Sequence, residues 1–74
     1  MKKLLSVVIP AYNEEAIIAR TAATLSAVLD EAHIPFELLF VDDGSKDATW
    51  RLITQIAAQD KRVRGISFSR NFGK

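Results

Sequence analysis

The apolar residues of this chain form two kinds of pattern, short continuous runs and stripes at helical spacing. Continuous runs occupy residues 4–9 and 36–41, and a shorter, weaker run occupies residues 63–68. Runs that are apolar on both faces are typical of strands in a buried parallel sheet. Pro10 cannot donate to a strand ladder, so we expect it to end the first strand.

The segment between the first two runs is patterned as a helix. We expect Asn13 to cap it, with Glu14 and Glu15 in its first turn, where acids favour the helix dipole. Pro35 ends the pattern, and the only histidine, His33, is interpreted as a helix-end residue and not as a catalyst. The apolar stripe consists of Ile17, Ile18, Ala22, Leu25, Val28, Leu29 and Ala32.

A second helical pattern, residues 47–59, follows the second apolar run. Gly44 allows a sharp reversal before it, and Ser45 is placed to cap it. Trp50 lies off the centre of the stripe, and we interpret it as a core residue and not as a base-stacking one. The stripe itself consists of Leu52, Ile53, Ile56 and Ala57.

The resulting order is strand, helix, strand, helix, strand, which predicts an α/β fold. Right-handed crossovers then give parallel strands in the order 3-2-1, half of a doubly wound nucleotide-binding sheet. Both helices would cover one face, although the strands are apolar on both. We therefore expect an incomplete, N-terminal part of a larger domain, whose uncovered sheet face would drive self-association of an isolated chain.

Length and composition limit the alternatives. Seventy-four residues make one small domain, and a net charge of +1 argues against a nucleic-acid partner. The chain has no cysteine, which excludes disulfides and thiolate chemistry. No run approaches the ~20 apolar residues of a membrane span, so contact with a membrane is expected only through segments outside these residues.

Two adjacent acids follow the second apolar run, where a buried strand becomes a turn. In open α/β sheets, ligands bind at this carboxyl edge, beside the loop that follows the first strand. An aromatic face suits a base, and a carboxylate accepts from a ribose hydroxyl or a base N–H. The alternative is a solvated turn with ordinary capping acids. The candidate nucleotide-binding residues are Pro10, Tyr12, Glu14, Val41, Asp42 and Asp43.

The usual phosphate-binding loops are missing. No Gly-x-Gly-x-x-Gly follows the first strand, and the chain has no P-loop. Acids at both expected helix starts would repel a phosphate. A diphosphate would then be held elsewhere, most simply by a divalent metal and later residues. Asp42 and Asp43 have no evident third metal ligand.

Three segments, residues 8–15, 41–49 and 69–74, resemble motifs of the family 2 glycosyltransferases. They read Val-Ile-Pro-Ala-Tyr-Asn-Glu-Glu, Val-Asp-Asp-Gly-Ser-Lys-Asp-Ala-Thr and Ser-Arg-Asn-Phe-Gly-Lys. The chain is most similar to the polyprenyl-phosphate (dolichol-phosphate) mannosyl- and glucosyltransferase group, and the resemblance covers its whole length.

The resemblance implies a three-layer, Rossmann-like GT-A fold that transfers a sugar from a UDP- or GDP-linked donor with inversion, using Mg²⁺ or Mn²⁺. It implies a polyprenyl-phosphate acceptor and a membrane-associated protein on the cytoplasmic side. The resemblance implies that Asp42 supports the turn. It assigns no firm contact to Arg70 or Lys74. The family's metal-binding Asp-x-Asp and its catalytic residues would follow Lys74, so no catalytic or metal residue is expected in this chain, which alone would be inactive. The nucleoside-pocket positions that match are Pro10, Tyr12, Glu14, Val41 and Asp43.

Two other classes of protein compete with this enzyme. One is a non-catalytic α/β nucleotide-binding or receiver-like domain, and the other is an interaction module. Receiver domains carry paired acids after the first strand, whereas here that strand runs into Pro10. An Asp-x-Asp about twenty to thirty residues beyond Lys74, as the resemblance implies, would decide for the enzyme.

Overall fold

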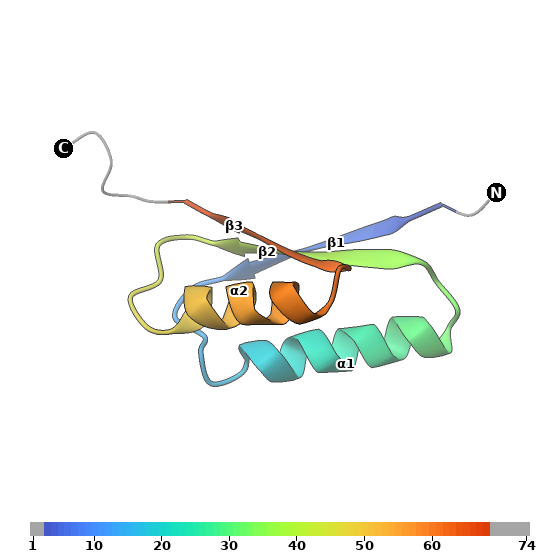
Figure 1. Cartoon of the computed structure of the whole chain (residues 1–74), viewed down its shortest axis with the longest axis horizontal. Helices are drawn as coiled ribbons and strands as arrows, with labels where there is room; N and C mark the ends of the chain where they lie inside the picture. The colour runs from blue at the N-terminus through green and yellow to red at the C-terminus, as the bar shows by residue number, and fades with distance from the viewer. Residues whose placement is uncertain (1–2, 69–74) are drawn as a thin grey trace.

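A computed structural model describes residues 3–68 of the chain. The strands are β1 (Leu5–Ala11), β2 (Phe36–Asp42) and β3 (Val63–Ser67), and the helices are α1 (Ile18–Glu31) and α2 (Thr49–Gln59). The strands are parallel with β2 in the middle, which confirms the predicted α/β fold and strand order. Both helices lie on one side of the sheet (Figure 1). The third motif, with Arg70 and Lys74, lies outside the described residues.

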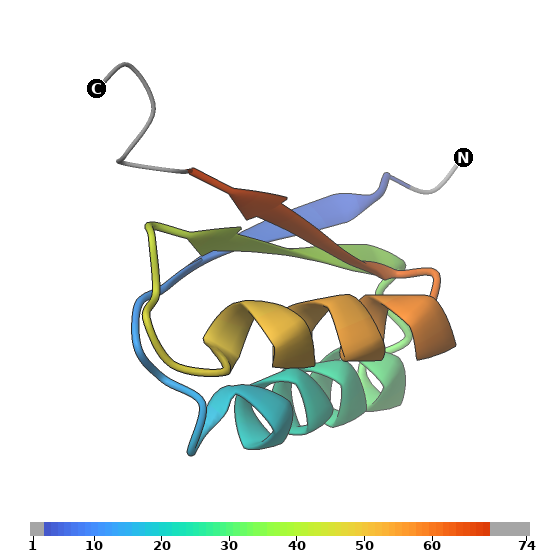
Figure 2. The same ribbon diagram turned by 60° about the vertical axis from the view of Figure 1, so that its left-hand side comes forward.

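The core lies between the sheet and the two helices. Alternate residues of β2, namely Phe36, Leu38 and Phe40, are buried on the helix side. Ile18 of α1 and Ile53 of α2 are buried against them. Each such side chain contributes about 1.5–3 kcal/mol relative to an exposed position. The α2 stripe faces the sheet as predicted, but in the α1 stripe Ile17, Val28 and Ala32 are exposed and the other members pack against the core. Helices α1 and α2 lie side by side beneath the sheet (Figure 2).

Gly65 lets α2 approach β3 closely. A Cβ atom at this position would lie 2.5 Å from Cγ2 of Ile53 and 3.1 Å from Cζ3 of Trp50. Trp50 is half-buried against the core, as predicted, and its ring covers the space that a side chain at position 65 would need. The absence of a side chain there, and not conformational freedom, explains this glycine.

The prediction that Pro10 ends the first strand is wrong, because β1 continues to Ala11. Leu5 donates its N–H to the carbonyl of Pro35 (2.9 Å). Ala11 accepts from the N–H of Asp43 (3.2 Å). Odd-numbered residues of β1 thus bond toward β2, so the nitrogen of Pro10 faces the opposite edge. Proline is tolerated where the ladder needs no N–H, as at an edge strand.

Both predicted helix starts are also wrong. Helix α1 begins at Ile18, with no acid in its first turn, and α2 begins at Thr49. Neither helix has a side-chain cap from the residue before it. Asn13 has a left-handed backbone (φ 52°), and Ser45 bonds elsewhere. Gly44, by contrast, makes the expected reversal with φ 78°.

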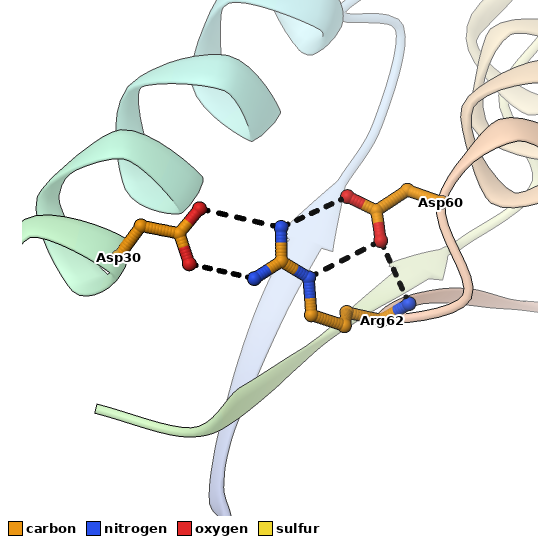
Figure 3. A network of polar contacts seen from close by, with 3 residues as sticks. All are labelled: Asp30, Asp60 and Arg62. Carbon is orange, nitrogen blue, oxygen red and sulfur yellow. Dashed lines mark hydrogen bonds and ion pairs between the residues drawn. The ribbon is translucent and has the colours of Figure 1, made fainter. Parts of the chain in front are cut away.

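Arg62, directly before β3, connects the amino end of this strand to the end of α1 through Asp30 (Figure 3). Its guanidinium donates to Asp30 at 2.7 Å and to Asp60 at 3.3 Å, and lies 4.4 Å from the centroid of the Phe36 ring. The hydrogen bonds to Asp30, then those to Asp60, raise the pKa of Arg62. Hydrogen bonds from the side chain of Arg62, and then from its backbone N–H, lower the pKa of Asp60. As predicted, His33 lies at the end of α1, in the left-handed conformation (φ 60°).

The face of the sheet opposite the helices carries no other described element. Apolar side chains lie exposed on its outer strands: Val8 is 61% exposed and Ile66 is 41% exposed. At its amino end the face is polar, because Glu37 accepts from Ser6 (2.6 Å) and pairs with Arg64 (3.7 Å). The described residues thus form two of the three layers that the resemblance implies.

Candidate nucleotide site

The carboxyl ends of β1 and β2 bring four of the six predicted residues together. Pro10 and Val41 are register partners on the face opposite the helices. Tyr12 and Asp43 follow directly where the two strands end, and both are exposed, Tyr12 by 53%. The ends are joined by the hydrogen bond from the N–H of Asp43 to Ala11. The predicted convergence at this sheet edge is therefore present.

The other two predicted residues lie differently. Asp42 is only 2% exposed, and its carboxylate is turned beneath the loop, where it accepts from the N–H (3.2 Å) and the hydroxyl of Ser45. Glu14 is half-buried, and its carbonyl accepts from Ile17 and Ile18 at the start of α1. Asp42 and Glu14 thus belong to the frame of the edge, whereas Tyr12 and Asp43 form its exposed part.

Side chains of residues 45–49 bind the backbone of the loop after β1. Ser45 Oγ accepts from the N–H of Asn13 at 2.8 Å. Thr49 Oγ1 accepts from the N–H of Glu14 at 2.7 Å, and Asp47 Oδ2 accepts from the next N–H at 3.2 Å. Three successive backbone donors are therefore satisfied by side chains two residues apart on the other loop.

The same pairing runs in the opposite direction. The side chain of Asn13 accepts from the N–H of Lys46 (2.7 Å). The carboxylate of Glu15 accepts from the N–H of Ala48 (2.7 Å). We call these hydrogen bonds between residues 13–15 and 45–49 the loop–loop network. It locks the two loops that carry Tyr12 and Asp43 into one unit.

Asp47 is held in its charged form by this network. Desolvation alone would raise its pKa, but hydrogen bonds from the hydroxyl and N–H of Thr49 and from the N–H of Glu15 outweigh it and lower the pKa. A lowered folded-state pKa gives stability that is present above the usual aspartate value of about 3.9. That stability is lost as the pH falls through the folded-state pKa, so the network is intact at neutral pH.

The backbone N–H groups at the start of α2, which could bind a phosphate, are already occupied. The carboxylates of Glu15 and Asp47 already bind the N–H groups of Ala48 and Thr49, where α2 begins. They precede the helix and do not stand in its first turn, where acids were predicted. Among the described residues, no three His, Asp or Glu side chains are grouped to hold a metal ion.

Sequence reasoning missed the residues of the loop–loop network as a set. Asn13, Ser45 and Asp47 were interpreted as local helix-start residues, whereas each of them also has a partner 32 or 33 positions away. The available signal was the concentration of polar side chains in residues 45–49, opposite the polar residues 13–15.

A family model described as Glycosyl transferase family 2 matches residues 6–74. An uncharacterized glycosyltransferase, YkcC of Bacillus subtilis, is 47% identical over 68 residues, which are 92% of this chain and 21% of that protein. Undecaprenyl-phosphate 4-deoxy-4-formamido-L-arabinose transferase of Aeromonas hydrophila is 38% identical over 97% of this chain and 22% of its own. The bactoprenol glucosyl transferase of Shigella phage SfV is 40% identical, over 95% and 23% respectively.

These figures describe a short stretch of much longer relatives. The chain spans about a fifth of the length of the curated relatives it matches. No helix in residues 3–68 is both long and apolar enough to cross a membrane.

Thr49→Val should loosen the loop–loop network without changing the size of the side chain. Thr49 is fully buried, and its replacement leaves the N–H of Glu14 without its acceptor. An unsatisfied buried donor costs about 1–3 kcal/mol. In the full-length protein, we expect amide hydrogen exchange at Glu14 to accelerate about tenfold or more. The matched control is Thr54→Val, which removes an exposed hydroxyl bonded within α2. Equal protection of Glu14 in both variants would contradict the prediction.

Proposed function

The chain belongs to glycosyl transferase family 2, and from this we propose that it supplies the nucleoside-binding half of a nucleotide-sugar site. Its three parallel strands and two helices are those of a truncated, Rossmann-like GT-A fold. In the full-length enzyme the donor is a UDP- or GDP-linked sugar, transferred with inversion. The 74-residue chain alone does not transfer sugar.

One observation carries the proposal: an exposed ring and an exposed carboxylate stand at the ends of two adjacent parallel strands. The ring of Tyr12 offers a face to a base, and Asp43 offers an acceptor to a base N–H or a ribose hydroxyl. Pro10 and Val41 provide an apolar surface beside them. The loop–loop network keeps the two loops in fixed relation before any ligand arrives, which lowers the entropy cost of binding.

The rest of the reaction belongs to other residues of the full-length protein. Two relatives are named for undecaprenyl phosphate and bactoprenol, which supports a polyprenyl-phosphate acceptor and a membrane-associated protein. We propose that the full-length protein acts on the cytoplasmic side. A divalent metal, Mg²⁺ or Mn²⁺, would neutralise the leaving diphosphate. No residue described here is proposed to hold it.

Asp43→Asn should weaken the binding of UDP or GDP by the full-length protein. Losing one charged hydrogen bond costs about 1.5–3 kcal/mol, or about 10- to 150-fold in affinity. Titration calorimetry measures this directly with both nucleotides. Asp30→Asn serves as the control, because Asp30 lies at the far end of α1. Unchanged affinity in a folded Asp43→Asn protein would remove this carboxylate from the site.

Tyr12→Ala should weaken binding of the same nucleotides more than Tyr12→Phe does. Stacking of a base on an aromatic side chain contributes about 1–3 kcal/mol, and phenylalanine keeps the ring. The hydroxyl contributes only a polar edge. If the phenylalanine variant binds as weakly as the alanine variant, the ring does not act by stacking.

The uncovered sheet face should make the isolated 74-residue chain associate. Val8 and Ile66 are exposed there, and large exposed apolar patches drive association. Val8→Lys with Ile66→Lys should shift the mass measured by analytical ultracentrifugation toward the monomer. Val28→Lys is the control, because Val28 is 58% exposed but lies on α1. A monomeric, cooperatively melting wild-type chain would show that this face needs no cover.

A further inference from the structure

We propose that Asp42 and Ser45 are positioning residues for the nucleoside site. In this proposal the buried carboxylate of Asp42 holds Ser45, and Ser45 in turn holds the loop that carries Tyr12. The inference rests on the proposed function, because it assigns these residues a task within the same site. It separates the two adjacent acids, with Asp43 facing the ligand and Asp42 acting only through Ser45.

The direction of the hydrogen bonds through Ser45 is fixed by chemistry. The N–H of Asn13 can only donate, so Ser45 Oγ accepts from it (2.8 Å). The hydroxyl hydrogen is therefore free to point the other way, toward Oδ1 of Asp42. The same oxygen accepts from the N–H of Ser45 (3.2 Å). Ser45 thus transmits the position of Asp42 to the backbone at Asn13.

Asp42 is a firm anchor for this chain of bonds. It is the last residue of β2, and its register partners are Ala11 on β1 and Ser67 on β3. Its carbonyl accepts from the N–H of Phe68 at 2.8 Å. A buried carboxylate is costly without hydrogen bonds, and here those bonds hold the turn in place. The anchor therefore belongs to β2, the middle strand of the described sheet.

Asn13, which donates this hydrogen bond to Ser45, has a left-handed backbone conformation. Its φ is 52°, in the left-handed region that asparagine occupies more readily than most residues other than glycine. Its N–H is held by Ser45, and its side chain is held by the N–H of Lys46 (2.7 Å). Tyr12 immediately precedes it. Releasing the N–H of Asn13 removes one of the two restraints on the backbone that aims the ring of Tyr12.

The experiment compares Ser45→Ala and Ser45→Thr in the full-length protein, with UDP and GDP as probes. The alanine variant should bind the nucleotide that the wild type prefers about tenfold more weakly, whereas threonine, which keeps the hydroxyl, should bind within about threefold. Ser26→Ala, which removes a hydroxyl on α1, is the matched control and should bind as the wild type does. All measurements are made well below the melting temperature of each variant.

A second pair of variants distinguishes position from charge. Asp42→Asn keeps an oxygen that can accept both bonds from Ser45, so it should bind within about threefold of the wild type, far less damaged than Asp43→Asn. If Asp42→Asn is as damaging as Asp43→Asn, the charge of Asp42 acts on the ligand and the proposal is overturned. Should Ser45→Ala fail to fold, this comparison decides alone.

Failure of the proposal and failure of the proposed function give different results. If the wild type binds neither UDP nor GDP, the function fails. Amide exchange at Asn13 then still tests the connection, and it should accelerate in Ser45→Ala but not in Ser26→Ala. If the wild type binds and Ser45→Ala binds equally well, with folding intact, the positioning role is wrong and the function stands.

Discussion

The need of backbone N–H groups for acceptors governs the carboxyl edge of this sheet. Two irregular loops meet there, and side chains accept from the N–H groups of residues 13–15, 45, 46 and 48. Unpaired amides that are shielded from water cost about as much as a lost hydrogen bond. Side chains of residues 45, 47 and 49 satisfy one loop, and those of residues 13 and 15 satisfy the other. The relative position of the two loops follows from this exchange.

The exchange also explains where the helices begin. Asn13 and Ser45 have the chemistry of N-caps, and an isolated peptide would use them locally. In the fold, a partner on the other loop competes for each side chain, and the tertiary bond prevails. Helix α1 then starts at Ile18, well after the predicted cap Asn13, and α2 starts at Thr49, two residues later than predicted. The polar groups freed from capping become the connection between the loops.

Periodicity was sufficient to predict the fold because burial is one-sided and regular. The alternation of Phe36, Leu38 and Phe40 and the stripe through Ile53 follow from the repeat of a strand and of a helix. Parallel order follows from the length and handedness of the crossovers. The continuation of β1 through Pro10 was not predictable in this way, because it depends on which edge its nitrogen faces. Likewise, the predicted order of strands and loops placed Tyr12 and Asp43 at one edge of the sheet. Only the three-dimensional contacts separate the buried Asp42 from the exposed Asp43.

The way this edge satisfies its amides limits what it can bind. Donors at the start of α2 are occupied by Glu15 and Asp47, and the hydrogen bonds that hold Asp47 ionised keep negative charge where a phosphate would otherwise sit. A ring and an acceptor remain exposed, groups that suit the uncharged part of a nucleotide better than its phosphates. Under the proposed function, this divides the donor site physically. Recognition of the nucleoside is built into a rigid sheet edge, and neutralisation of the diphosphate must come from groups elsewhere in the full-length protein.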